Sequence, residues 1–338
     1  MHGESSREQT APPVPKAGVV VPKASVVVPA HNEAAVIGRL LSGLSAEAEP
    51  GEFEILVVAN GCTDGTEEVA ASFGPEVRVL STPEPNKYRA MRLADATAGH
   101  FPRLYVDADV ELDTASVRAL AQALGEPGVL AVGPERHSPM DGRPWTVRWY
   151  YEVWHRLPVV RAGLFGRGVV GLSREAHRRI GELPEFMGDD LAASLAFPAQ
   201  QRRVVPGALA VVHPPRRLRD LLRLRIRALV STTQIGGGGT ELSEAAAEAR
   251  TTRADLVHVL RAGSPADAPK VAWFVTVTLI VRFRARRAIK AGDYRTWLRD
   301  ESSRRPAESA QPAESARSKE SAQPEESTQS EESADARG

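Results

Sequence analysis

Two aspartates separated by a single residue are the side chains with the clearest chemistry in this chain. Asp107 and Asp109 follow the apolar segment Leu104–Val106, which has the composition of a buried strand. Two carboxylates at the mouth of such a strand repel each other unless a cation lies beside them. Carboxylate oxygens suit hard cations such as Mg²⁺ or Mn²⁺, and Mg²⁺ often completes its shell with substrate phosphates. The pair therefore predicts a divalent-cation site that serves a nucleotide diphosphate.

Polar residues also follow two earlier apolar segments. The first segment ends in His31-Asn32-Glu33, and the second ends in Asn60-Gly61-Cys62-Thr63-Asp64. Open parallel sheets bind ligands outside the carboxyl ends of their strands, so we expect these residues and the aspartate pair to share one edge. The alternative is that Asn, Asp and Gly only end strands and cap helices, which accounts well for Asp64. A lone histidine is more often structural, so His31 is assigned no catalytic role.

Short apolar, β-branched segments alternate with segments of helical periodicity over residues 25–133. They predict strands over 25–30, 54–60, 77–81, 103–109 and 129–135, and helices over 37–44, 65–73, 87–98 and 117–124. Asp64 is expected to cap the second helix, with Glu67 at its third position. Strands that alternate with helices indicate an α/β fold, with a doubly wound, mostly parallel sheet flanked by helices.

The alternation weakens after Pro134. Helices are expected over Leu172–Ile180 and over the basic segment Leu218–Leu229, followed by a helical C-terminal segment over residues 236–303. The predicted catalytic domain spans residues 23–235. Residues 1–22 and the ESAQP-like repeats of residues 304–338 cannot bury enough apolar surface to offset their ordering entropy, so we expect two disordered tails.

Composition narrows the class of protein. The chain has 338 residues, of which 42% are hydrophobic, and its 43 basic side chains equal its 43 acidic ones, so a nucleic-acid partner is not expected. The single cysteine, Cys62, rules out an internal disulfide and a cysteine-built zinc site, and it fits a reducing cytoplasm. We expect neither a signal peptide nor a membrane-spanning segment, and we predict a cytoplasmic location.

The segment that comes nearest to a membrane span is Val271–Val281, which is followed by the basic run RFRARRAIK. Two interpretations stay open for it. It is either a buried helix or strand, or an element on a membrane surface with its arginines on lipid phosphates. The second interpretation predicts peripheral membrane contact at the inner face of the plasma membrane.

Four segments together resemble the family 2 glycosyltransferases in their order and spacing. They are VVVPAHNE from Val26, VVANGCTDGT from Val57, the helix start at Asn86-Lys87, and YVDADVELD from Tyr105. The resemblance covers roughly residues 24–230. It implies a GT-A fold, a nucleotide-diphospho-sugar donor, and inverting transfer of the sugar to an acceptor hydroxyl on a glycan, a lipid-linked molecule or a small molecule.

The resemblance also implies roles for individual residues. Asp109 would be the main ligand of a divalent cation, Mg²⁺ or Mn²⁺, and Asp107 would support it. In FMGDDL, the pair Asp189-Asp190 is similar to the family's acidic pair, in which the second acid, here Asp190, would be the catalytic base. The donor would be contacted by Pro29, Asn32, Glu33, Asn60, Asp64, Lys87 and Asp107.

Two departures from the family pattern limit what it implies. Ala59-Asn60-Gly61-Cys62 stands where Asp-Asp-Gly-Ser is usual, so recognition of the nucleotide base is expected to differ. The Gln-x-x-Arg-Trp motif of processive members is absent, which argues against a processive polymerase with a long membrane domain.

The implied reaction is an in-line displacement at the anomeric carbon of the sugar. Asp190 would take the proton of the attacking hydroxyl, a step typically worth about 10²–10⁴ in rate. The cation would neutralise charge on the leaving diphosphate. His213 follows the strand-like segment Ala208–Val212, and it is either structural or a third ligand that reaches the metal.

Two further clusters have both a structural and a functional interpretation. The aromatic residues between Trp145 and Trp154 are at helical spacing, so they either pack in the core or stack on a sugar acceptor. Arg219, Arg223 and Arg227 lie four apart and share a helix face. That face is either solvated, or it meets a donor phosphate, an anionic lipid surface or a phosphate-bearing acceptor.

Three other classes of protein fit the sequence less well. Gly166, Gly168 and Gly171 match a dinucleotide-binding fingerprint, but no apolar strand leads to the acids about twenty residues further on. A nucleotidyltransferase acting on a sugar phosphate usually has a Gly-rich, basic loop after its first strand, where this chain has AHNEAA. A non-catalytic nucleotide-sugar-binding module is disfavoured because metal-binding and catalytic acids occur together.

Overall fold

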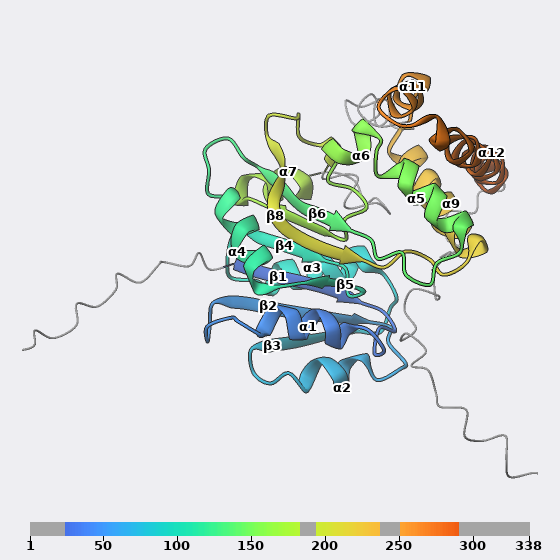
Figure 1. Cartoon of the computed structure of the whole chain (residues 1–338). Helices are drawn as coiled ribbons and strands as arrows, with labels where there is room; N and C mark the ends of the chain where they lie inside the picture. Colours follow the sequence, from blue (N-terminus) through green and yellow to red (C-terminus); the bar gives the residue numbers. More distant parts are fainter. Residues whose placement is uncertain (1–23, 183–193, 237–250, 291–338) are drawn as a thin grey trace, which may run out of the picture. The chain divides into compact units, whose positions relative to one another are not determined.

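An eight-stranded sheet forms the centre of the computed structural model, which describes residues 24–182, 194–236 and 251–290. Its strands in chain order are β1 (Ala24–Ala30), β2 (Phe53–Asn60), β3 (Val77–Thr82), β4 (Arg103–Val106), β5 (Val110–Leu112), β6 (Ala131–His137), β7 (Val169–Leu172) and β8 (Arg202–Val212). They lie in the order β3-β2-β1-β4-β7-β6-β8-β5 (Figure 1). Four of the seven pairings, β1–β2, β2–β3, β1–β4 and β6–β8, are parallel. The predicted mostly parallel α/β sheet is confirmed.

Helices cover both faces of the sheet, as expected for a doubly wound fold. One layer contains α1 (Ile37–Ser45), α2 (Thr66–Ala71) and α4 (Thr114–Ala123), and the other contains α3 (Lys87–Thr97) and α7 (Arg174–Gly181). Side chains of β1 alternate between the layers, with Val26 and Val28 in the first and Val27 in the second. Burial on both faces explains why this strand has a continuous apolar sequence.

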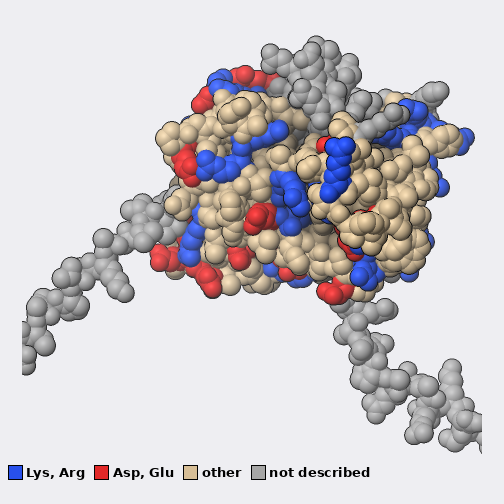
Figure 2. All heavy atoms as spheres, turned by 45° about the horizontal axis from the view of Figure 1, so that its top comes forward, with Lys and Arg blue, Asp and Glu red and all other residues tan. Residues whose placement is uncertain are grey.

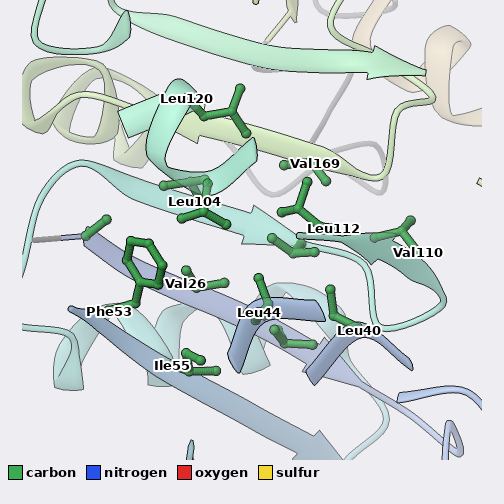
Figure 3. Packing of buried hydrophobic residues seen from close by; sticks show 14 of the residues in the cluster. Val26, Leu40, Leu44, Phe53, Ile55, Leu104, Val110, Leu112, Leu120 and Val169 are labelled. Carbon is green, nitrogen blue, oxygen red and sulfur yellow. The ribbon is translucent and has the colours of Figure 1, made fainter. Parts of the chain in front are cut away.

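The first helix anchors the loop that carries predicted donor contacts. Four apolar residues at helical spacing face the sheet and are fully buried: Ile37, Leu40, Leu41 and Leu44. Figure 3 shows Leu40 and Leu44 close to Val26 of β1. Each such leucine contributes about 1.5–3 kcal/mol by leaving water. The chain between β1 and α1 is therefore held at both ends by buried structure.

A second core lies between helices of the second half of the chain. These helices are α5 (Trp145–Trp154), α9 (Leu218–Gly236), α11 (Arg253–Arg261) and α12 (Ala268–Lys290), and the short α6 (Pro158–Ala162) follows α5. Tyr150 and Phe274 stack with their ring centroids 4.9 Å apart, and Trp273 Nε1 donates to the carbonyl oxygen of Thr146 at 2.8 Å. The helices described within the predicted C-terminal segment thus pack on α5 and α9.

The apolar segment Val271–Val281 lies within α12 and buries one side of that helix. The buried positions recur three or four apart, at Val271, Phe274, Val277 and Val281. The interpretation of this segment as a buried helix therefore holds for its inner face. None of the helices in the described residues is long and apolar enough to cross a membrane.

The predicted boundaries of α7 and α2 are wrong. Leu172 closes β7, and α7 begins only after Ser173, whose Oγ accepts a hydrogen bond from the N–H of Ala176 as an N-cap. The N-cap of α2 is Gly65 rather than Asp64, and the helix ends at residue 71 rather than 73. Gly65 has a φ of 83°, a left-handed conformation that glycine adopts without strain, so the helix begins one residue later than predicted.

Candidate active site

The loops after β1 and β2 meet at the carboxyl edge of the sheet and are joined by hydrogen bonds. Asn32 has a φ of 51°, which asparagine tolerates, and its Oδ1 accepts from the N–H of Thr63 at 2.8 Å. Asn60 is buried, and its Nδ2 donates to the carbonyl oxygen of Ala30 at 2.7 Å. His31 Nδ1 donates to the carbonyl oxygen of Asn60 at 2.6 Å. These contacts fix the backbone of both loops.

Asp64 belongs to the same network. Its carboxylate accepts from the N–H of Ala34 at 3.0 Å and from the N–H of Thr66 at 3.2 Å. Burial alone would raise the pKa of Asp64, but the hydrogen bonds from Thr66 and Ala34 outweigh it and lower the pKa. Glu33 is buried nearby, and its N–H donates to Thr66 Oγ1 at 2.8 Å. These bonds give Asp64 a structural role between the two loops, and donor contact by Asp64, Glu33 or the buried Pro29 stays a prediction.

After the end of β4, Asp107 forms an ion pair with a lysine of α3. Lys87, the first residue of α3, places its Nζ 2.7 Å from Oδ1 of Asp107. The two side chains are 28% and 42% exposed, so a ligand can reach both. The N–H of Asp107 donates to the carbonyl oxygen of Gly168 at 2.8 Å, and β4 ends one residue before Asp107 rather than at residue 109 as predicted.

Val110 of β5 pairs with Val212 at the end of β8. Asp109 comes just before the first of these residues, and His213 comes just after the second. His213 Nε2 lies 2.6 Å from Glu111 Oε1 and 3.2 Å from a terminal nitrogen of Arg39. These contacts occupy Nε2 of His213, and its role as a third metal ligand stays a prediction. The sequence analysis missed Glu111 of β5 and Arg39, which only the packing of α1 brings here.

The described residues contain no group of three or more His, Cys, Asp or Glu side chains that could hold a metal ion. One or two carboxylates completed by substrate phosphate oxygens are instead the arrangement typical of Mg²⁺ in nucleotide sites. Asp107 and Asp109 fit a cation of that kind. The other predicted acids, Asp189 and Asp190, lie outside the described residues.

The glycine-rich segment at residues 166–171 connects this edge to the second half of the sheet. Gly168 has a φ of 67°, and a Cβ at this position would stand 2.3 Å from Val110 Cγ1, so only glycine fits. The segment enters β7, which pairs antiparallel with both β4 and β6. A dinucleotide fingerprint opens a strand–turn–helix unit with a parallel strand. The geometry here does not match that interpretation.

The aromatic cluster on α5 is mainly part of the helical core. Tyr150, Tyr151 and Trp154 are buried, whereas Trp145 is 53% exposed. The core interpretation therefore accounts for most of the cluster, and stacking on a sugar acceptor stays a prediction for Trp145.

The arginines on the predicted basic face of α9 surround an acid. Arg219 and Arg223 are exposed and lie 3.6 Å and 3.5 Å from Oδ1 of Asp220, which is 4% exposed. Arg227, one turn further along, is partly exposed. The solvated interpretation accounts for the first two arginines, and contact with a phosphate stays a prediction for all three.

The fold is that of an α/β domain of the GT-A type. Residues 25–170 match the profile of glycosyl transferase family 2, so the resemblance seen in the sequence is confirmed and the chain carries a region of this family. No curated protein sequence matches the chain.

Two solved structures illustrate the similarity. One is a mannosyltransferase from Pyrobaculum calidifontis in complex with GDP-Man and Mn²⁺, with 18% identity, a TM-score of 0.58, and coverage of 81% of this chain and 89% of that chain. Another is glucosyl-3-phosphoglycerate synthase from Mycobacterium tuberculosis in complex with phosphoglyceric acid, with 21% identity, a TM-score of 0.47, and coverage of 62% and 78%. The similarity to the mannosyltransferase shows that the two chains share a fold.

Proposed function

We propose that this protein transfers a sugar from a nucleotide-diphospho-sugar donor to an acceptor hydroxyl, with inversion at the anomeric carbon. The observation that carries the proposal is the position of Asp107 and Asp109 at the carboxyl edge of the sheet, with Lys87 Nζ 2.7 Å from Asp107. The family 2 match over residues 25–170 supports it, as does a fold shared with a mannosyltransferase bound to GDP-Man and Mn²⁺.

In this proposal Asp109, supported by Asp107, holds a divalent cation, and His213 is the candidate third ligand. When bound, Mg²⁺ or Mn²⁺ supplies positive charge that stabilises the leaving diphosphate. Lys87 adds a further positive charge at the same edge. Of the acidic pair at residues 189 and 190, Asp190 takes the proton of the acceptor hydroxyl as the new carbon–oxygen bond forms.

Thermal unfolding with a panel of nucleotide diphosphates and nucleotide-sugars tests the donor site. A ligand at about 100 times its dissociation constant stabilises the native state by roughly 2.7 kcal/mol. We expect stabilisation that needs Mn²⁺, is abolished by EDTA and disappears in Asp109→Ala. Asp141→Ala, which removes an exposed carboxylate outside the site, is the matched control and should retain it. Stabilisation of Asp109→Ala equal to that of the unmodified protein would place the metal elsewhere.

Transfer assays with the nucleotide-sugar found in this way test the chemistry. Asp190→Asn should bind the donor normally and lose transfer, since it lacks the base. Transfer at the unmodified rate would assign the base to another residue. Release of pyrophosphate from a nucleoside triphosphate would instead indicate a nucleotidyltransferase, and donor binding without any turnover would indicate a binding module.

We further propose that the protein is cytoplasmic and contacts the inner face of the plasma membrane through the outer side of α12. Leu279 and Phe283 on this side are 58% and 61% exposed. The helix contains no Asp or Glu, and its last turns carry Arg282, Arg284, Arg286 and Arg287. Exposed apolar side chains among arginines are typical of helices that lie on anionic membranes.

Vesicle co-sedimentation tests this contact. We expect binding to vesicles that contain anionic lipid, weaker binding to neutral vesicles, and loss of binding in Phe283→Ser. Leu209→Ser removes an apolar side chain that is 43% exposed on β8 and should bind like the unmodified protein. Equal sedimentation of Phe283→Ser and the unmodified protein would contradict the proposal.

A further inference from the structure

A cavity of about 320 Å³ lies beside the predicted donor edge, where α5 and α6 meet the end of β6. Small-molecule sites commonly begin at about this size. Its wall contains three arginines, Arg136, Arg161 and Arg167, and one carboxylate, Glu135. In the part of the chain that the structure describes, no carboxylate forms an ion pair with any of these arginines. Figure 2 brings forward the side on which α6 lies, and it shows Lys and Arg side chains across the middle of that face, with most Asp and Glu along its left and lower edges.

Arg167 supplies charge to this cavity and is itself held by the backbone. It is 6% exposed, and its guanidinium donates to the carbonyl oxygens of Gly163 at 2.9 Å, Pro134 at 2.9 Å and two residues of α6. Burial, followed by the nearby charge of Arg136, lowers the pKa of Arg167 to about 10, so the group is still protonated at neutral pH. A buried cation without an acid raises the electrostatic potential of the space around it.

Arg136 and Arg161 have donors that a ligand can use. Arg136 lies 4.9 Å over the ring of Trp154, with Nε donating to Ser138 Oγ at 2.9 Å. Arg161 is exposed, and within the described residues its guanidinium makes one hydrogen bond, from Nε to the carbonyl oxygen of His155 at 3.2 Å. Within the described residues, the terminal nitrogens of Arg161 make no hydrogen bond that would compete with a ligand. A planar guanidinium binds phosphate and carboxylate groups through two parallel hydrogen bonds.

One short loop separates this cavity from the aspartate pair. The carbonyl oxygen of Gly166 accepts a hydrogen bond from Arg136, and two residues later the carbonyl oxygen of Gly168 accepts from the N–H of Asp107 at 2.8 Å. The pKa of Arg136 is lowered, chiefly by burial, while Asp109 is near enough to act in the opposite direction. The cavity and the predicted metal site thus lie on two sides of the same loop.

We propose that this cavity binds the anionic group of the acceptor, so that the acceptor is a small molecule carrying a phosphate or a carboxylate. The inference rests on the proposed transferase function and specifies its acceptor class. The anion would be held by Arg161 and Arg136, within the field of Arg167. Glu135 does not cancel this charge, because it is a single carboxylate and its Oε2 accepts from the N–H of Gly207 at 3.3 Å.

Calorimetric titration of the full chain with inorganic phosphate, and separately with acetate, tests the cavity directly. We expect saturable binding of at least one of the two ions, weakened by about 10- to 100-fold in Arg161→Gln, since hydrogen bonds to charged groups contribute at that level. Arg136→Gln should show a similar loss. Because Arg136 is partly buried, the exposed Arg161 keeps the test valid if that variant does not fold. Arg78→Gln, which removes an exposed arginine of β3, is the matched control and should bind the ion unchanged.

A second titration, with the nucleoside diphosphate identified above and Mn²⁺, separates acceptor from donor. Arg161→Gln should leave nucleotide affinity unchanged while ion binding is lost. Loss of both would assign the arginines to the donor diphosphate and overturn the proposal, as would ion binding that is unaffected by Arg161→Gln or absent from the unmodified protein. Glycerol phosphate should compete with inorganic phosphate, whereas glycerol should not. If nucleotide binding fails in the unmodified protein while the ion still binds, the proposed function fails and the anion site stands.

Discussion

Arg103 and Arg136 both lie against aromatic rings, and their surroundings differ in one respect. Arg103, at the start of β4, is 2% exposed, lies 4.5 Å over the ring of Phe101 and pairs with Asp95 at 2.7 Å. Arg136, at the end of β6, lies 4.9 Å over the ring of Trp154. Among the described residues, Arg136 has no carboxylate partner. The first arginine is neutralised within the fold, and the second leaves positive charge at a cavity.

The acid beside Arg103 is the centre of a closed network. Asp95 also accepts from the hydroxyl of Tyr105 at 2.6 Å and lies 3.2 Å from Nε2 of His177. Burial alone would raise the pKa of Asp95, but the hydrogen bonds from His177, Tyr105 and Arg103 outweigh it and lower the pKa. A buried cation with its own acid serves stability, whereas one without an acid is available to an anionic ligand.

The largest expected effect comes from breaking the closed network. Asp95→Asn should lower the free energy of unfolding by about 3–5 kcal/mol, because Arg103 would remain buried without a counter-charge. Urea unfolding measures the change. Glu84→Gln removes the partner of the exposed Arg89 and should cost less than about 1 kcal/mol. A similar loss of stability in the two variants would show that the buried pair Asp95–Arg103 stabilises the fold no more than the exposed pair Glu84–Arg89 does.

The next largest effect should come from a substitution at Gly168, in the loop between the cavity and the aspartate pair. Gly168→Ala should cost roughly 1–3 kcal/mol, because the residue has a positive φ and its Cβ would collide with Val110. It should also reduce transfer, since Gly168 accepts the N–H of Asp107. Gly142→Ala has the same φ of 67° with nothing within 4 Å of its Cβ, so it isolates the backbone cost. Equal losses of activity in the two variants would argue against a positional role for this loop.

Acid should destabilise the folded protein through His155, which lines the cavity beside Arg136 and Arg161. Burial, followed by the charges of Arg136, Arg225 and Arg167, lowers the pKa of His155 to about 4. The unfolded state, with a pKa near 6.5, therefore binds more protons between these values, and stability falls as pH drops from about 6.5 to 4. Because His155 is partly exposed, we expect a loss of about 1–2 kcal/mol. Urea unfolding at several pH values should show this component in the unmodified protein and not in His155→Gln.

The smallest expected effect comes from replacing Arg136, which has no carboxylate partner among the described residues. Arg136→Met should change the free energy of unfolding by less than about 1 kcal/mol, since a desolvated cation is replaced by an apolar side chain of similar length. Arg103→Met should be far more costly, because it leaves Asp95 buried without its cation. If Arg136→Met is as destabilising as Arg103→Met, the contrast between the two arginines does not hold and Arg136 is mainly structural.

The first half of the sheet could be predicted from the sequence, whereas the second half could be predicted only in part. β1 and β2 are buried on both faces, and their continuous apolar composition reveals this directly. β5 and β7 have three and four residues and pair antiparallel with strands distant in the chain. Such short strands show no periodicity of their own, and the last residue of β7, Leu172, reads as the start of the helix that follows it.

The sequence by itself determined the chemical groups of the candidate site and the edge at which they meet. Asp107 and Asp109 follow β4, and Lys87 begins α3, two elements whose existence the local pattern predicts. Only the tertiary structure decided which charges have partners. Lys87 meets Asp107 and Arg103 meets Asp95, whereas Arg136 meets aromatic rings and a cavity. Charge pairing depends on packing between elements far apart in the chain, and local periodicity carries no information about those distances.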